Sequence, residues 1–215
     1  MKPILFNTEM VKAILGGIKT VTRRIIKPQP DKKHCYPLGY VNSSTDSKNI
    51  GCFGWGIDEY GGNIHYAKPP YQVGDIIYVR ETWTPYCINK KTCSNLLLSH
   101  ANYCYKASPK ECVDSLGCKW HPSIHMPKEV ARIFLKVTDV RVERLQNITS
   151  DDAVSEGSLL FKKYTNTIIR NTEGTIPRTQ FMLLWNSTIK KEQIEQYSWE
   201  ANPYVWVIEF ERCEK

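Results

Sequence analysis

The 215-residue sequence lacks several features that would each assign it to a large class of proteins. No stretch approaches the roughly 18 apolar residues that a membrane-spanning helix needs. The N-terminal residues do not follow the basic-then-apolar order of a signal peptide, and no internal repeat or low-complexity segment occurs. We therefore expect a cytoplasmic protein without a membrane partner, built as a single domain over residues 1–215.

Paired cysteine spacing is also missing. None of the eight cysteines forms a Cys-x-x-Cys pair, so we expect thiols rather than a disulfide framework. We expect no metal and no cofactor, with one alternative left open. That alternative is a structural zinc, which would use Cys104, Cys112, Cys118 and His121 despite a spacing unlike that of a zinc knuckle or ribbon.

The sequence does contain an excess of basic residues. There are 29 Lys and Arg against 22 Asp and Glu, a formal net charge of +7 that is spread along the chain. Such a balance suits a nucleotide or nucleic-acid partner, although many basic proteins bind neither.

Apolar periodicity predicts an α+β chain in which strands are separated by single short helices. In residues 131–145 the apolar parity shifts near Thr138-Asp139, which predicts a β-bulge. Segments 28–70 and 84–123 are expected to form two long irregular insertions, the first as a long loop or a weak hairpin. A small mixed β-barrel with flanking helices fits this order better than a doubly wound sheet. The other strands are expected at residues 1–6, 76–80 and 204–210, and the helices at 8–15, 150–156 and 177–185.

The stretch Gly16–Arg24 has the composition of a functional site, because Lys19, Thr22, Arg23 and Arg24 follow a flexible Gly-Gly step. In a regular strand Lys19 and Thr22, three residues apart, would face opposite sides. They can converge only if the chain turns at Lys19 before it becomes extended.

Four ordered blocks carry a family resemblance. The chain resembles the ASCH domain of the PUA-like superfamily, in the expanded form found in phage and prophage proteins, which adds Arg80-Glu81-Thr82-Trp83 and Ile124-His125-Met126-Pro127. The blocks are Gly17-Ile18-Lys19-Thr20-Val21-Thr22-Arg23-Arg24, Val73-Gly74-Asp75-Ile76-Ile77-Tyr78-Val79, Ile148-Thr149 to Glu156-Gly157, and Val205-Trp206-Val207-Ile208-Glu209-Phe210.

This resemblance implies a PUA-like β-barrel and an association with RNA or nucleotides. Small bacterial ASCH amidohydrolases remove the acetyl group of N4-acetylcytidine with a lysine, a threonine and a glutamate, which implies catalytic roles for Lys19, Thr22 and Glu156. Arg24 matches a nearby arginine of the family. Chemically, Thr22 needs a base, and Lys19 can serve if its pKa falls toward neutrality. Backbone amides after Gly17 would stabilise the oxyanion.

Other polar and aromatic residues are candidates for substrate binding. We expect Arg23, Arg80, Glu81 and Trp83 to line the same cleft, because strand ends often carry site residues and an aromatic ring can stack on a base. The alternatives are that Trp83 is a core anchor and that Arg80 pairs with a carboxylate. Weaker candidates are Trp55, Trp120 and His125, whereas Trp185 and Trp206 lie in apolar-periodic runs and are expected in the core.

Three functions remain open at this point. The first is an amidohydrolase that acts on an N4-acylated cytidine or a related nucleobase. The second is a module that binds RNA or a modified base without chemistry, or an ASCH-type ribonuclease. The third is binding of a host protein by the cysteine-rich insertion, which no residue pattern supports.

Overall fold

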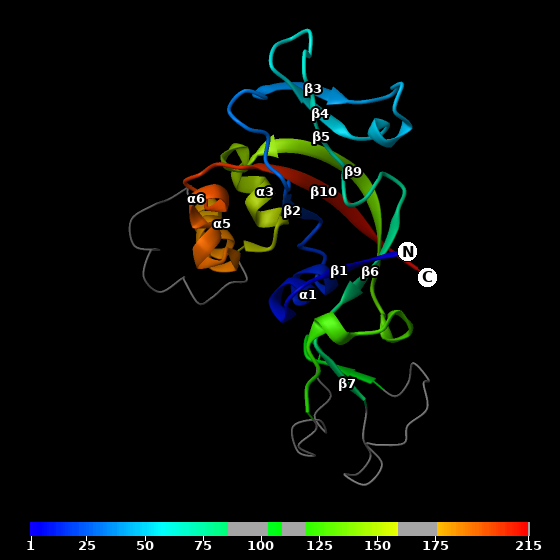
Figure 1. Ribbon diagram of the computed structural model, residues 1–215. Helices are drawn as coiled ribbons and strands as arrows, with labels where there is room; N and C mark the ends of the chain where they lie inside the picture. Colours follow the sequence, from blue (N-terminus) through cyan, green and yellow to red (C-terminus); the bar gives the residue numbers. More distant parts are fainter. Residues whose placement is uncertain (86–102, 109–118, 159–175, 215) are drawn as a thin grey trace.

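A mixed five-stranded sheet is the centre of the fold in the computed structural model, which describes residues 1–85, 103–108, 119–158 and 176–214 (Figure 1). The parallel pair β1–β6 is followed by three antiparallel pairs. The sheet order is β1 (Lys2–Leu5), β6 (Ile76–Arg80), β9 (Phe134–Arg144), β10 (Tyr204–Cys213) and β2 (Val21–Ile25).

Short helices pack against this sheet (Figure 1). They are α1 (Thr8–Leu15), α3 (Ser150–Ser155), α5 (Ile176–Thr188) and α6 (Ile194–Tyr197). α1 packs in one core with β1, β6 and β9, whereas α3 and α5 pack in a second core with β2 and β10. Single 3₁₀ turns occur at Ser47–Asn49, Ser123–His125, Lys128–Val130, Leu145–Asn147 and Lys191–Gln193. Among the described residues, no helix has both the length and the apolarity needed to cross a bilayer.

The expected bulge in β9 is confirmed. Glu209 of β10 pairs with Asp139, but the next residue, Phe210, pairs with Val137, so Thr138 is the extra residue. The sheet bends here, and β9 and β10 curve together over the site (Figure 1). Within the described residues no ladder joins β1 to β2, so the closed PUA-like barrel stays a prediction.

Residues 28–70 are more ordered than the expected long loop or weak hairpin. They hold an antiparallel sheet of β3 (Tyr36–Tyr40), β4 (Phe53–Gly56) and β5 (His65–Ala67), which packs on the central sheet above β9 (Figure 1). The glycines here serve close packing, since a Cβ on Gly56 would lie 2.8 Å from the Gly61 backbone. Trp55, a weaker site candidate, is fully buried in the core.

The second expected insertion is described in part. β7 (Trp83–Pro85) and β8 (Tyr103–Tyr105) form a small antiparallel ladder within residues 84–123. Trp83 also makes backbone hydrogen bonds to His121, which ties this ladder to the segment that leads into β9. The rest of the insertion lies outside the described residues.

A glycine permits the close contact between α1 and the end of α3. Thr149 caps α3 in a capping box with Asp152, and the helix ends at Glu156. Gly157 then takes the left-handed conformation at φ +81°, and a Cβ there would lie 3.0 Å from Ala13 Cβ. Gly157 therefore sets how closely Glu156 approaches the segment that follows α1.

We predict that Gly157→Ala lowers the free energy of unfolding by about 2 kcal/mol, through backbone strain and the clash with Ala13. Urea denaturation measures the loss. Gly16→Ala is the matched control, because Gly16 has an ordinary φ of −80° and a Cβ there meets nothing closer than 3.4 Å. Equal losses in the two variants would contradict the assignment.

Candidate functional site

Lys19 is placed by the end of α1. Asn7 caps the start of this helix, with its side chain accepting from Met10 N. Gly17 follows the helix in the left-handed conformation at φ +72°. The turn falls at Gly16-Gly17, residues 18–20 belong to no helix or strand, and the strand begins only at Val21. Strand alternation therefore does not separate Lys19 from Thr22, and both line one pocket.

The backbone amides after Gly17 cannot form the predicted oxyanion hole, because they already have acceptors. Ile18 N and Lys19 N both donate to the carbonyl of Ala13, and Thr20 N donates to Ser155 O. The first two bonds satisfy the C-terminal end of α1. An oxyanion in this site would need side-chain donors.

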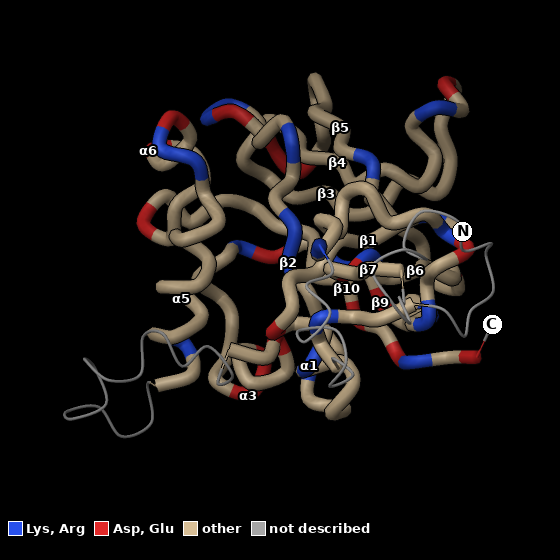
Figure 2. Tube along the Cα trace, turned by 90° about the horizontal axis from the view of Figure 1, so that it is seen from below, with Lys and Arg blue, Asp and Glu red and all other residues tan. Residues whose placement is uncertain are grey.

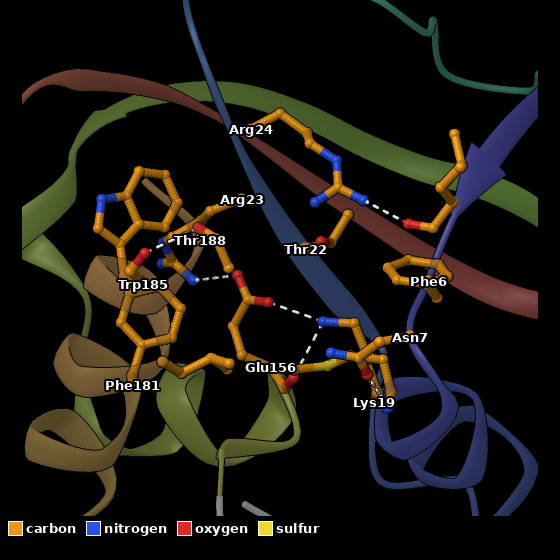
Figure 3. A pocket seen from close by; sticks show the side chains of 13 residues that line it. Phe6, Asn7, Lys19, Thr22, Arg23, Arg24, Glu156, Phe181, Trp185 and Thr188 are labelled. Atoms are coloured by element: carbon orange, nitrogen blue, oxygen red, sulfur yellow. Dashed lines mark hydrogen bonds and ion pairs between the residues drawn. The ribbon is translucent and has the colours of Figure 1, made fainter. Parts of the chain in front are cut away.

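The Lys19 ammonium is buried and all three of its protons have acceptors. Its Nζ lies 2.7 Å from Val21 O, 2.9 Å from Glu156 O and 2.7 Å from Glu156 Oε2. Two parts of the chain 137 residues apart are thereby joined (Figure 3). Burial lowers the pKa of Lys19 below its ordinary value, and the Glu156 carboxylate opposes this shift.

Arg23 completes the charged cluster from the other side of Glu156. Its Nη1 lies 3.4 Å from Glu156 Oε1, while Nη2 contacts Asp152 Oδ2 at 3.1 Å and Glu143 Oε2 at 3.2 Å. Glu156 is therefore held between two buried cations, one on each carboxylate oxygen. We refer to Lys19, Arg23 and Glu156 as the charged cluster.

The charged cluster lies against a pocket of about 250 Å³ (Figure 3). The polar residues of its lining are Asn7, Thr22, Arg24, Thr188 and the charged cluster. Aromatic and aliphatic side chains complete the lining, namely Leu5, Phe6, Met10, Phe181, Leu184 and Trp185, and Phe6 lies across the pocket from Phe181 and Trp185 (Figure 3). Such a combination of apolar walls and a few converging polar groups is typical of a small-molecule site.

Thr22 presents its hydroxyl to this pocket (Figure 3). Its side chain is buried, yet no hydrogen bond to the hydroxyl occurs among the residues that the structure describes. The hydroxyl is therefore available to a ligand, in contrast to the saturated Lys19 ammonium.

The backbone of β2 also offers groups to the pocket side. Phe210 N donates to Thr20 O and Ile26 N donates to Tyr204 O, so the even-numbered residues of this strand bond to β10. The odd-numbered residues point away from β10, as the contact of Val21 O with Lys19 Nζ shows. The backbone N–H and C=O of Arg23 therefore point away from β10, at the outer edge of β2, where they form an adjacent donor and acceptor.

Arg24 lies beside Thr22 on the pocket wall. Its Nη2 donates to Leu5 O at 3.1 Å, and its Cζ is 5.4 Å from the centre of the Phe6 ring. Lys19 Nζ lies at the same distance from that ring, so Phe6 carries a cation on each of two sides. The bond to Leu5 links β2 with the end of β1, the two edges of the central sheet.

Arg80, Glu81 and Trp83 do not share this pocket, contrary to expectation. Glu81 is buried and bound on both oxygens by Arg132, at 2.8 and 3.0 Å. Trp83 stacks on His121, with ring centres 5.1 Å apart. The Arg80 side chain donates to Ile124 O at 3.3 Å, and its guanidinium lies 5.7 Å from the centre of the Tyr78 ring.

Neither of the remaining weaker candidates, Trp120 and His125, lines the pocket. Trp206 is buried in the core as expected, and Trp185 both packs in the core and forms part of the pocket wall. Of the possible zinc ligands, Cys112 and Cys118 lie outside the described residues, so that alternative remains untested.

The sequence reasoning missed Phe6, Asn7 and Thr188 as pocket residues. A signal existed for the first two, since they start the helix whose end delivers Lys19. An eight-residue helix followed by a tight turn returns the chain to this neighbourhood. No comparable signal placed Thr188, which lies at the end of α5.

Comparisons with protein-family models, curated proteins and solved structures gave no match to this chain.

We predict that Glu156→Gln lowers the free energy of unfolding by about 3 kcal/mol, because two buried cations lose their shared carboxylate. Glu211→Gln is the matched control, since Glu211 and its partner Lys136 are both more than half exposed. The control should lose less than about 0.5 kcal/mol. Similar losses, measured by urea denaturation, would argue that the charged cluster contributes no more than a surface pair.

Proposed function

We propose that this chain is a nucleotide- or RNA-directed hydrolase that resembles the ASCH amidohydrolases and removes the acyl group of an N4-acylated cytidine or a related nucleobase. One observation carries the proposal. Lys19 and Glu156, distant in sequence, meet at 2.7 Å on the wall of a pocket that Thr22 also lines. The resemblance to the ASCH amidohydrolases implies these three residue types for deacylation, and a hydroxyl nucleophile beside a base fits that chemistry.

In the proposed first step Thr22 Oγ1 attacks the acyl carbon. Its proton passes to Lys19 Nζ, which must be in the neutral form, and the lowered pKa of Lys19 makes that form accessible. Lys19 then returns the proton to the exocyclic nitrogen as the C–N bond breaks. The products of this step are the free base and an acyl-threonine ester.

In the second step water hydrolyses the ester. Lys19 takes a proton from the water and returns it to Thr22 Oγ1 as the carbon–oxygen bond of the ester breaks, which releases the carboxylic acid. Glu156 holds Lys19 in place throughout, since it accepts from Nζ through both its carboxylate and its backbone carbonyl. The side-chain donors of Asn7 and Arg24 line the pocket and are the groups to stabilise the oxyanion.

The shape of the pocket supports a nucleobase as the bound group. Its volume of about 250 Å³ is below the roughly 300–1,000 Å³ of sites for drug-sized ligands, which favours a single planar ring. Phe181 and Trp185 supply aromatic walls for stacking. Under the same proposal the curved central sheet is a PUA-like barrel. The hydrogen bond from Arg24 to Leu5 O then connects its two edge strands, β2 and β1.

One observation favours non-catalytic binding of RNA or a modified base as the second candidate. All three Lys19 protons are held by protein acceptors, so the charged lysine has no lone pair with which to accept a proton. In that case the charged cluster is structural. The Thr22 hydroxyl and the backbone N–H and C=O of Arg23 would then recognise a base through hydrogen bonds. Product formation separates the two candidates.

We predict that Thr22→Val abolishes deacylation of N4-acetylcytidine, by about 10³-fold or more, because the isosteric side chain has no nucleophile. Thr22→Ser should retain measurable turnover. Release of cytidine, followed by chromatography, is the measurement, and circular dichroism checks that both variants are folded. If the wild-type protein at high concentration produces no cytidine, the hydrolase proposal fails and the binding candidate stands.

The rate should also depend on pH. Since the neutral Lys19 is the base and burial lowers its pKa, kcat/KM should rise with pH through an apparent pKa below the ordinary lysine value of about 10.4. Above that pKa the rate should level off. A rate that falls over this range would count against Lys19 as the base.

A further inference from the structure

A second hollow adjoins the pocket and contains three cationic side chains. It has a volume of about 300 Å³ and is lined by Arg24, Ile25, Lys27, Lys68, Pro70, Tyr71 and Trp206. We call it the basic groove. Arg24 lines both the pocket and the basic groove, so the two hollows share a wall.

The cations of the basic groove lack carboxylate partners among the described residues. The side chain of Arg24 donates to a backbone carbonyl, and Lys27 contacts the ring of Tyr197 at 4.8 Å. Lys68 is exposed immediately after β5 and has no ion pair in the part of the chain that the structure describes. No acidic residue lines the groove.

Among the described residues, Arg23, Arg132 and Arg141 are neutralised by carboxylates. Arg23 contacts three of them, Arg132 binds Glu81 through two nitrogens, and Arg141 pairs with Asp139 and Glu143. With three cations and no acidic residue in its lining, the basic groove has a positive local potential. In Figure 2 the blue of Lys and Arg continues along β2 and the segment after it.

The geometry of the groove suits an anion with several oxygens. Arg24 offers planar donors at one wall, and Lys27 and Lys68 offer point charges at the rim. Trp206 and Tyr71 form apolar surface beneath them, and Tyr71 keeps its proton, because burial raises the pKa of its hydroxyl, which donates to Pro3 O. A phosphate can accept hydrogen bonds from the planar Arg24 donors and from the lysine ammonium groups through different oxygens.

We infer that the basic groove binds a phosphate group of the same molecule whose base occupies the pocket. This inference rests on the proposed function for the base, and it adds the place at which a phosphate of the nucleotide, either free or within an RNA strand, would bind. Arg24 lies between the two subsites, where the sugar would pass. The groove thus supplies affinity, while the pocket selects the base.

The test compares ligands that cannot be deacylated. Calorimetry measures the affinity of the wild-type protein for cytidine, cytidine 5′-monophosphate, cytidine 3′-monophosphate and a cytidine-centred trinucleotide, at low and at high salt. We expect at least one phosphorylated ligand to bind about tenfold more tightly than cytidine at low salt, and this preference to decrease as salt rises. The position and number of phosphates then separate a mononucleotide from a strand.

Two double variants locate the effect. Lys27→Ala with Lys68→Ala should lower the ratio of nucleotide affinity to nucleoside affinity by about tenfold. Lys48→Ala with Lys128→Ala removes the same net charge from exposed positions outside the groove, and should leave the ratio unchanged. Equal affinities for cytidine and all phosphorylated ligands, or equal effects of the two double variants, would overturn the inference.

Failure of the inference is distinguishable from failure of the proposed function. Deacylation of N4-acetylcytidine without any preference for phosphate removes the phosphate subsite and keeps the hydrolase. A preference for phosphate that depends on Lys27 and Lys68, without deacylation, removes the hydrolase and keeps the subsite. Absence of binding to all four ligands overturns both the inference and the nucleobase assignment.

Discussion

The removal of three charges from water is the constraint on which the site depends. Lys19, Arg23 and Glu156 are almost completely buried, and each desolvated charge costs several kcal/mol unless it is paired and hydrogen-bonded. The turn after α1, the edge strand β2 and the end of α3 supply one member each. Because both cations depend on the Glu156 carboxylate and Glu156 contacts each of them, these three elements are fixed relative to one another, and the pocket wall is fixed with them.

These contacts separate the group that stabilises the fold from the group that remains available to a ligand. The three protons of the Lys19 ammonium are donated to acceptors within the protein, whereas the Thr22 side chain lines the pocket and its hydroxyl is available to a ligand. A reaction at Thr22 therefore has to draw on a proton acceptor that the fold also uses as a support. Functional sites commonly retain strained or buried polar groups at a cost in stability, whereas a purely structural core would have apolar residues at those positions.

Features that depend on local signals could be predicted from the sequence. The positions of α1 and α3, the glycines after α1 and the bulge near Thr138-Asp139 each follow from a few neighbouring residues. The small sheet in residues 28–70 was missed because glycines that allow close packing look like loop glycines. The separation of Glu81 from the site was missed because its partner, Arg132, is 51 residues away.

The candidate site was predicted in part for the same reason. The sequence showed that Lys19 and Thr22 can face one site only if the chain turns before the strand begins. It did not show that the backbone amides of residues 18 and 19 donate to Ala13 O, because this acceptor depends on how α1 ends. The contact of Lys19 with Glu156 was expected from the family resemblance. Its geometry, with one carboxylate oxygen for each cation, required the packing of α3 against α1.

The outward edge of β2 has a consequence for self-association. An edge strand with open N–H and C=O groups is a template on which a second copy of the chain can add a strand. Here the helices that enclose the pocket stand over that edge, and the side chain of Lys19 already occupies one of its carbonyls. The residues around the pocket thus also shield the edge of β2 from pairing with a strand of a second molecule.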